Sequence, residues 1–176
     1  MKILLRIVLS VVGIVVLIVL GAYADGATMP VDHSVSVTGT VAAPPEKVFA
    51  LIANIAAGAT WRPEVKSVEV LPSDNTRDAW IEDLGSGEKM KFLALTTVPP
   101  DAGGHALRKV ETKEPAYGGT WTYDLSPGPT PDTTTLKITE DGYINPPIYR
   151  FMMAHIFGST KNLNDYMTHI QAAATK

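Results

Sequence analysis

The stretch YINPPIYRFMMAHIFGSTKNLNDYMTHIQ, from Tyr143 to Gln171, decides the fold, because it is a long run that is apolar on a helical period. Asn145 and the two prolines after it mark the start of the helix, since proline fits the first helical turn. We expect this helix to run almost to the C-terminus. Gly158 interrupts it, which costs about 1 kcal/mol relative to alanine.

Upstream of this helix, apolar and polar residues alternate in short runs, which is typical of strands. Residues with turn chemistry, such as SDNT at 73–76 and GSGE at 85–88, separate neighbouring runs. A helix within 43–55 and a second short helical piece over 54–60 follow the first run. The predicted strands cover 34–41, 66–71, 78–84, 89–98, 106–113, 118–125 and 134–140.

The predicted order is one strand, two short helices, six strands and one long helix. Consecutive strands joined by short loops form an antiparallel sheet, and its apolar face needs a cover. Only the C-terminal helix is long enough to provide that cover. We therefore expect an α+β domain over 34–176 in which a curved antiparallel sheet of about seven strands wraps round the long helix.

The N-terminal segment 1–24 is of a different kind, because it is basic at its start and then uncharged and apolar. One interpretation is a cleaved secretory signal that ends at an A-x-A-like site, Ala22 to Ala24. The other is a retained membrane anchor, since 7–24 would span about 27 Å as a helix, close to the roughly 30 Å of a hydrocarbon core. Residues 25–33 are then a linker. Lys2 and Arg6 precede the apolar run, so either interpretation places the domain outside the cytoplasm, as a membrane-anchored or a secreted or periplasmic protein.

Composition narrows the classes of partner. The chain has no cysteine, which excludes a disulfide framework and a thiol nucleophile. Apart from Lys2 and Arg6, its basic residues are outnumbered by 18 acidic ones, and no Lys/Arg run follows the apolar segment. Nucleic acid is therefore not expected as a partner.

Four motifs carry a resemblance to a known group of proteins. They are VTGTVAAPPEKVFALIANI (37–55), WRPEVKSVEVL (61–71), ITEDGYINPPIYRF (138–151) and GSTKNLNDYMTHIQ (158–171). In this order they resemble the START-like, helix-grip superfamily (SRPBCC), which includes polyketide cyclases and dehydrases, lipid-transport proteins and other ligand carriers. The resemblance implies a deep apolar cavity between the sheet and the long helix. It does not decide function, because the superfamily contains carriers, sensors and enzymes.

Nine residues are candidates for the wall of such a cavity. Methionine adapts to variable apolar shapes, and the first half of the C-terminal helix carries two of them side by side, whereas Leu163 to Ile170 is expected to be packed core. Aromatic residues on the sheet can either line a cavity or fill a small core completely, and Trp61 can form a mouth or a simple plug. The ligand-binding candidates are Trp61, Trp80, Phe92, Trp121, Tyr123, Tyr149, Met152, Met153 and Ile156.

Candidates for catalysis are few. Glu82, Glu140 and Arg108 share faces with apolar strand residues, and a carboxylate in an apolar cavity would have a raised pKa and could act as acid or base. A solvated or ion-paired strand residue is the competing interpretation. His155 is a second weak candidate for a base, against the alternative of a hydrogen-bonded histidine at the boundary between sheet and helix.

No metal or other cofactor is expected. His155 and His169 share the last helix but would lie about 21 Å apart along it, too far to bind one ion. His33 and His105 have no ligand spacing around them. The chain also lacks a G-x-S-x-G nucleophile motif.

The favoured function is binding or transport of a hydrophobic small molecule or lipid between the sheet and the C-terminal helix. The alternative is a cyclase- or dehydratase-like enzyme that acts on an apolar substrate. A third possibility is a scaffold whose own aromatic side chains fill the interior. A cavity below about 300 Å³ would favour the scaffold.

Overall fold

The computed structural model describes residues 1–72, 77–85 and 87–176, and the turn predicted at 73–76 lies outside them. The predicted strand–helix–strand–helix order is confirmed. The elements after the N-terminal helix α1 are β1 (Asp32–Val41), α2 (Pro45–Ala53), η1 (Ile55–Ala57), α3 (Gly58–Trp61), β2 (Ser67–Val70), β3 (Ala79–Asp83), β4 (Lys89–Val98), β5 (Ala106–Lys113), β6 (Tyr117–Pro127), β7 (Thr134–Ile144), α4 (Pro147–Met152), η2 (Met153–Phe157) and α5 (Lys161–Ala174).

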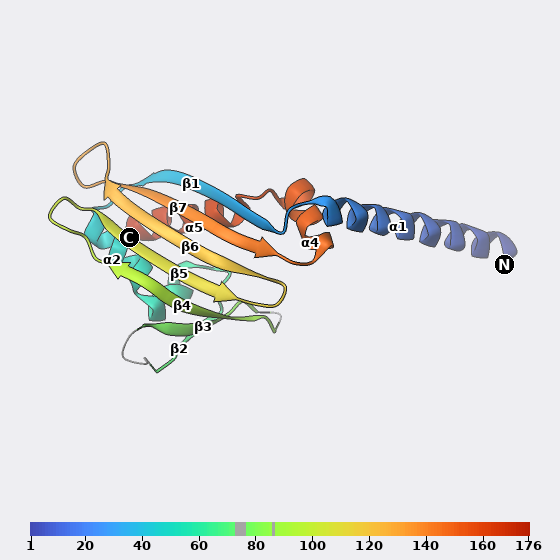
Figure 1. The fold of residues 1–176 in the computed structure, drawn as a ribbon, viewed down its shortest axis with the longest axis horizontal. Helices are drawn as coiled ribbons and strands as arrows, with labels where there is room; N and C mark the ends of the chain where they lie inside the picture. The colour runs from blue at the N-terminus through green and yellow to red at the C-terminus, as the bar shows by residue number, and fades with distance from the viewer. Residues whose placement is uncertain (73–76, 86) are drawn as a thin grey trace.

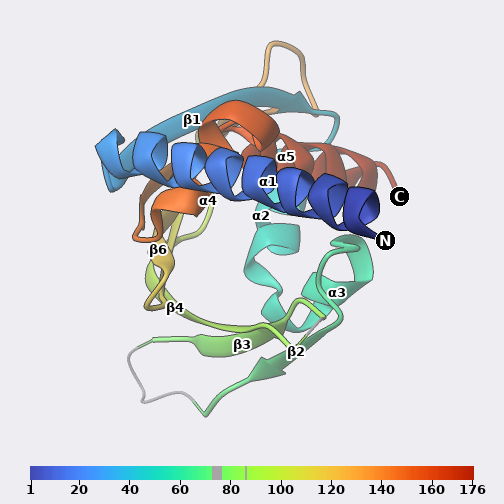
Figure 2. The same cartoon turned by 90° about the vertical axis from the view of Figure 1, so that its right-hand side faces the viewer.

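Within the described residues, seven strands form one antiparallel sheet in the order β1-β7-β6-β5-β4-β3-β2. Each strand from β3 to β7 pairs with its sequence neighbour, and β1 closes on β7. Figure 2 shows the sheet curving from β1 past β6 and β4 to β3 and β2, with α2, α3 and α5 on its inner side. This is the helix-grip architecture predicted from the sequence.

The core lies between the concave face of the sheet and the helices α2 and α5. The apolar stripe of α5 is fully buried, as predicted, because its residues fall on one helical face. The core continues through Val48 and Ile52 of α2 to the inward-facing residues of β6 and β7, such as Leu125 and Ile138. The buried residues of the α5 stripe are Leu163, Tyr166, Met167 and Ile170.

The expected single C-terminal helix is wrong in detail, because it is divided into three pieces. After α4, the backbone forms a π-helical turn, in which the N–H of Gly158 donates to the carbonyl of Met153 at 2.9 Å. Gly158 then adopts φ 85° and ψ 137°, a conformation open essentially to glycine alone. The chain resumes as α5 at Lys161.

Helix α1 (Lys2–Thr28) projects from the domain along its long axis (Figure 1). It is long and apolar enough to cross a membrane, a test that N-terminal signal sequences also pass. It continues beyond residue 24, and β1 begins at Asp32, so the connection is shorter than the linker expected over 25–33.

The end of α1 is packed directly on α4. Arg150 is buried there, and its Nε donates to the carbonyl of Gly26 at 2.9 Å. Its Nη1 donates to the carbonyls of Ile144 and Asn145 at 2.8 and 2.6 Å. Gly26 permits this close approach, because a Cβ at that position would collide with the carbonyl of Pro147.

Candidate functional site

A cavity of about 760 Å³ lies between the concave face of the sheet and the helical segment from α4 to α5. It therefore exceeds the size that would have favoured a filled scaffold. The sheet contributes one face because paired residues such as Phe92 and Thr112, or Trp121 and Glu140, point to the same side. The side chains that line the cavity include His33, Arg62, Glu64, Glu82, Met90, Phe92, Val110, Trp121, Tyr123, Glu140, Tyr143, Tyr149, Met152, Met153, Phe157, Tyr166 and His169.

Aromatic rings form one wall of this cavity. Tyr166 of α5 lies at the centre of the group, with its ring centroid 5.3 Å from Tyr123 and 5.8 Å from Trp121. Trp61 packs edge-on against Tyr166, with 5.2 Å between the two ring centroids. Trp61 itself is not part of the cavity wall. Burial raises the pKa of Tyr123 well above its usual value and also raises that of Tyr166, so both phenols are neutral donors at physiological pH.

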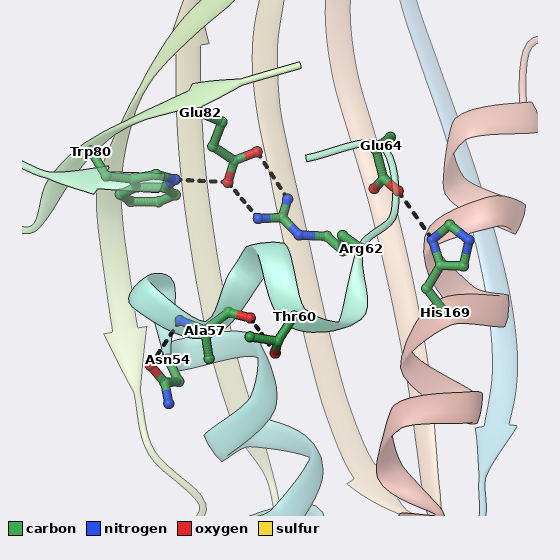
Figure 3. Close-up of polar contacts among 8 residues, drawn as sticks. All are labelled: Asn54, Ala57, Thr60, Arg62, Glu64, Trp80, Glu82 and His169. Carbon is green, nitrogen blue, oxygen red and sulfur yellow. Dashed lines mark hydrogen bonds and ion pairs between the residues drawn. The ribbon is translucent and has the colours of Figure 1, made fainter. Parts of the chain in front are cut away.

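An ion pair between Arg62 and Glu82 (Figure 3) also lines the cavity. Arg62 donates from Nη2 to Glu82 Oε1 at 2.6 Å and from Nη1 to Oε2 at 3.0 Å. Glu82 Oε1 also accepts the indole N–H of Trp80 at 2.9 Å. Burial is the largest single influence and lowers the pKa of Arg62, but the hydrogen bonds to Glu82, the charge of Glu82 and the neighbouring tyrosines together outweigh it, so the pKa lies above its usual value. The Glu82 carboxylate thus accepts three hydrogen bonds and is not available as a free base.

A second acidic group in the cavity is paired with a histidine. His33 of β1 and Glu140 of β7 lie across the strand pair, with Nε2 and Oε1 3.4 Å apart. The hydrogen bond to Glu140 raises the pKa of His33 above 6.5, against an opposing effect of burial. The pair therefore holds a proton to a higher pH than a free histidine does. Such a pair can orient a polar group of a ligand or take part in acid–base chemistry.

A third pair lies near the start of β2. His169 Nδ1 and Glu64 Oε2 are 3.3 Å apart (Figure 3). This is an ion-pair distance, but the geometry is not that of a hydrogen bond. Both residues line the cavity.

Six of the nine ligand-binding candidates line the cavity, namely Phe92, Trp121, Tyr123, Tyr149, Met152 and Met153. Trp80 does not, because it is buried in the core and stacks on Phe92 at 5.4 Å. Trp61 lies behind Tyr166 rather than in the cavity wall. Whether the six contact a ligand stays a prediction.

Ile156 is displaced from the cavity wall by the π-helical turn. In a regular helix, Ile156 would share a face with Met152 and Met153. The wider turn shifts the phase, so Phe157 lines the cavity and Ile156 is 62% exposed.

Of the two weak catalytic candidates, only Glu82 is a cavity residue. Glu82 lines the cavity, as described above. His155 does not line it, because the π-helical turn leaves it on the surface, where its Nε2 lies 2.9 Å from Asp25 Oδ2 of α1. Of the other polar candidates, Glu140 lines the cavity, whereas Arg108 is buried beside it.

Sequence reasoning missed His33 and Arg62 as cavity residues. His33 falls within the linker expected over 25–33. It is nevertheless an even number of residues from Val35 and Val37, so extending their alternation back by two residues places it on the inner face of the sheet. Arg62 follows α3 in a loop, where no periodic signal exists. Its partner is 20 residues away.

No group of three or more His, Cys, Asp or Glu side chains that could hold a metal ion occurs in the part of the chain that the structure describes. The cavity has charged groups only as pairs, and no cluster among the described residues suggests a particular cofactor.

Comparison with known proteins supports the fold and a family. Residues 32–159 match the family model described as polyketide cyclase/dehydrase and lipid transport. No curated protein sequence matches the chain.

Several solved structures share the fold at low sequence identity. The ZhuI aromatase/cyclase from Streptomyces sp. R1128 has 17% identity and a TM-score of 0.63, over 82% of this chain and 94% of that one. Truncated norcoclaurine synthase from Thalictrum flavum has 15% identity and a TM-score of 0.61, over 83% and 95%. A START superfamily protein from Mycobacterium smegmatis has 18% identity and a TM-score of 0.61, over 81% and 97%.

Proposed function

Because the chain belongs to the polyketide cyclase/dehydrase and lipid transport family, we propose that it binds or carries a hydrophobic small molecule or lipid in the cavity between sheet and helix. The observation that carries the proposal is the cavity itself. At about 760 Å³ it lies within the roughly 300–1,000 Å³ typical of small-molecule sites, and the protein's own Trp, Phe and Met side chains line it without filling it.

Affinity would come mainly from apolar burial, at about 25 cal/mol per Å² before the cost of ordering. Met152 and Met153 suit a ligand of variable shape, because their side chains are flexible. The ion pair Arg62–Glu82 and the pair His33–Glu140 provide the few polar groups that orient a ligand.

We further propose that α1 is a retained membrane anchor and that the domain lies outside the cytoplasm. Basic residues precede the apolar run and Asp25 follows it. The end of α1 packs on α4, which also contributes Tyr149 and Met152 to the cavity wall. A ligand that resides in the bilayer would then be supplied close to the cavity.

The test is recovery of a ligand from the full chain. We expect lipid extraction and mass spectrometry of protein purified in detergent to yield a bound apolar molecule at near-stoichiometric amounts. A Met152→Trp variant fills part of the cavity and should carry several-fold less. The matched control is Ile156→Trp on the same helical segment, which faces outward and should carry as much as the wild type. Repeatedly empty wild-type preparations, or equal loading of the three proteins, would contradict the proposal.

One observation favours a second candidate function, a cyclase- or dehydratase-like enzyme. The His33–Glu140 pair lies in the cavity wall beside Tyr143 and could take a proton from a bound substrate. This site replaces the expected base His155, which is outside the cavity. Under this function, molecules recovered from the His33→Gln variant would differ in mass from those of the wild type, for example by one water. Identical extracts would leave binding as the function.

A further inference from the structure

A second, smaller cavity of about 40 Å³ adjoins the main one. The two share a wall that includes Glu82, Phe92 and Tyr166. On its own side the small cavity is bordered by Trp61 and Arg108. Its volume exceeds the roughly 10–15 Å³ that one water requires.

Arg108 is the most unusual residue at this cavity, because it is a cation only 2% exposed that forms no ion pair in the described structure. Its Nη1 makes a long contact of 3.5 Å with Thr97 Oγ1, and its Nη2 has no hydrogen-bond partner among the described residues. Its Cζ lies 5.8 Å from the ring centre of Trp80. Burial lowers its pKa, and the charge of the exposed Asp78 opposes that effect without overcoming it. A buried cation with so little compensation is costly, so an acceptor is missing.

Two other donors at the same cavity are also unpaired. Trp61 Nε1 and Arg62 Nε are buried atoms for which the described part of the chain offers no acceptor. Indole and guanidinium nitrogens can donate but cannot accept a hydrogen bond. Three unpaired donors around one void therefore call for a group that only accepts.

The charges at this cavity also call for an anion. Two guanidinium groups face one carboxylate, Glu82, which already accepts three hydrogen bonds. Ordered water could fill the space, but it would leave the charge of Arg108 uncompensated. We propose that the small cavity binds a monovalent, carboxylate-sized anion through Arg108, Arg62 Nε and Trp61 Nε1.

The same carboxylate chemistry can come from two sources. One is a free small anion such as formate. The other is the carboxyl end of the apolar cargo, reached through the wall shared with the main cavity. This second source rests on the proposed function, whereas the site itself does not.

The indole N–H signals of the uniformly ¹⁵N-labelled full chain in nanodiscs provide a direct readout. Trp61 reports on the small cavity and Trp121 on the main one. The two signals are assigned with the Trp61→Phe and Trp121→Phe variants. At constant ionic strength we expect sodium formate to shift the Trp61 signal saturably. In Arg108→Met, formate affinity should fall at least tenfold, and an apolar replacement of a poorly paired buried cation is expected to leave the fold intact.

Dodecanoate and dodecanol distinguish the two sources. If dodecanoate shifts both signals and dodecanol shifts only Trp121, the anion is the head of the cargo. If formate alone shifts Trp61 and neither amphiphile shifts Trp121, the anion site stands while the proposed function fails for these ligands. A Trp61 signal that no carboxylate moves, or that moves equally in Arg108→Met, overturns the proposal even where Trp121 responds to the amphiphiles.

Discussion

Glu82 is the residue on which the buried polar groups of this protein converge, because it joins Arg62 of the loop after α3 to Trp80 within β3. Removing its charge leaves the Arg62 guanidinium buried without a counter-ion. We expect Glu82→Gln to lower the free energy of unfolding by about 3–5 kcal/mol, the usual cost of breaking a buried pair from one side. Urea denaturation of the domain measures it.

The matched control is Glu69→Gln on the neighbouring strand β2, where the side chain is exposed. It should change the free energy of unfolding by no more than about 0.5 kcal/mol. Equal losses in the two variants would show that the Arg62–Glu82 pair contributes nothing particular to stability.

His33 gives the protein a dependence of stability on pH with a definite sign. Its pKa in the folded state is raised above 6.5 by Glu140, so the folded state binds this proton more tightly than the unfolded one. The contribution to stability is therefore fully present below about pH 6.5 and is lost as pH rises through the raised pKa. The difference in unfolding free energy between wild type and His33→Gln should therefore shrink as the pH is raised above about 6.5. In Glu140→Gln, the NMR titration midpoint of His33 should move down; an unchanged midpoint contradicts the assignment.

For single residues, the sequence was sufficient to predict which aromatic side chains face inward, but not which polar side chains pair with one another. Alternation on strands places Phe92, Trp121 and Tyr123 on one face, and the structure puts all three in the cavity wall. Arg62 could not be found in this way, because a loop residue has no period and its partner is distant in sequence.

Among the elements, the break between η2 and α5 controls which residues of the last helical segment reach the cavity. Gly158 provides it with a positive φ, and a Cβ there would meet no atom within 4 Å. The cost of Gly158→Ala is therefore one of backbone strain, about 1–3 kcal/mol, and not of collision. Thermal or urea unfolding should show this loss.

Ser159→Ala is the control for that variant, since the adjacent residue needs no positive φ. It should be close to neutral. If Gly158→Ala is also neutral, a regular helix can form through this region, and Ile156 would then turn toward the cavity.

The sequence indicated that Gly158 interrupts the helix, but it could not show the π-helical turn before it. A helical period of 3.6 assigns Ile156 to the cavity face, and a single inserted residue in the turn gives that place to Phe157. A helical period predicts which side chains face the cavity only as long as that period continues along the segment.

For the whole molecule, the order of elements was sufficient to predict a curved sheet round a helix, because few antiparallel topologies satisfy it. The open interior could not be predicted from residue types. Trp, Phe and Met can equally fill a core or line a cavity, and the outcome depends on how far α4 stands from the sheet. The contacts of α4 include some between segments far apart in the sequence, such as Arg150 of α4 with Gly26 of α1, and residue types do not predict these.

Under the proposal that α1 is a membrane anchor, the contacts between α1 and α4 determine where the cavity lies relative to the bilayer. If α1 spans the membrane, its end at Thr28 emerges beside α4 and η2, whose Ile156 and Phe157 are 62% and 47% exposed. We expect these two side chains to enter the membrane interface. Because the chain has no cysteine, Ile156→Cys gives a single site for an environment-sensitive fluorophore. In full-length protein reconstituted into liposomes, its emission should shift to the blue and be quenched by spin-labelled lipids.

Val98→Cys is the matched control, since Val98 is 48% exposed and lies at the end of β4 that points away from α1 (Figure 1). A fluorophore there should remain in water and escape quenching. Equal quenching at both sites would mean that the domain lies flat on the membrane, and quenching at neither would mean that α1 does not hold the domain against it. Either result would contradict the idea that a ligand passes directly from the bilayer into the cavity, because the route from the lipid to the cavity would no longer run past the end of α1.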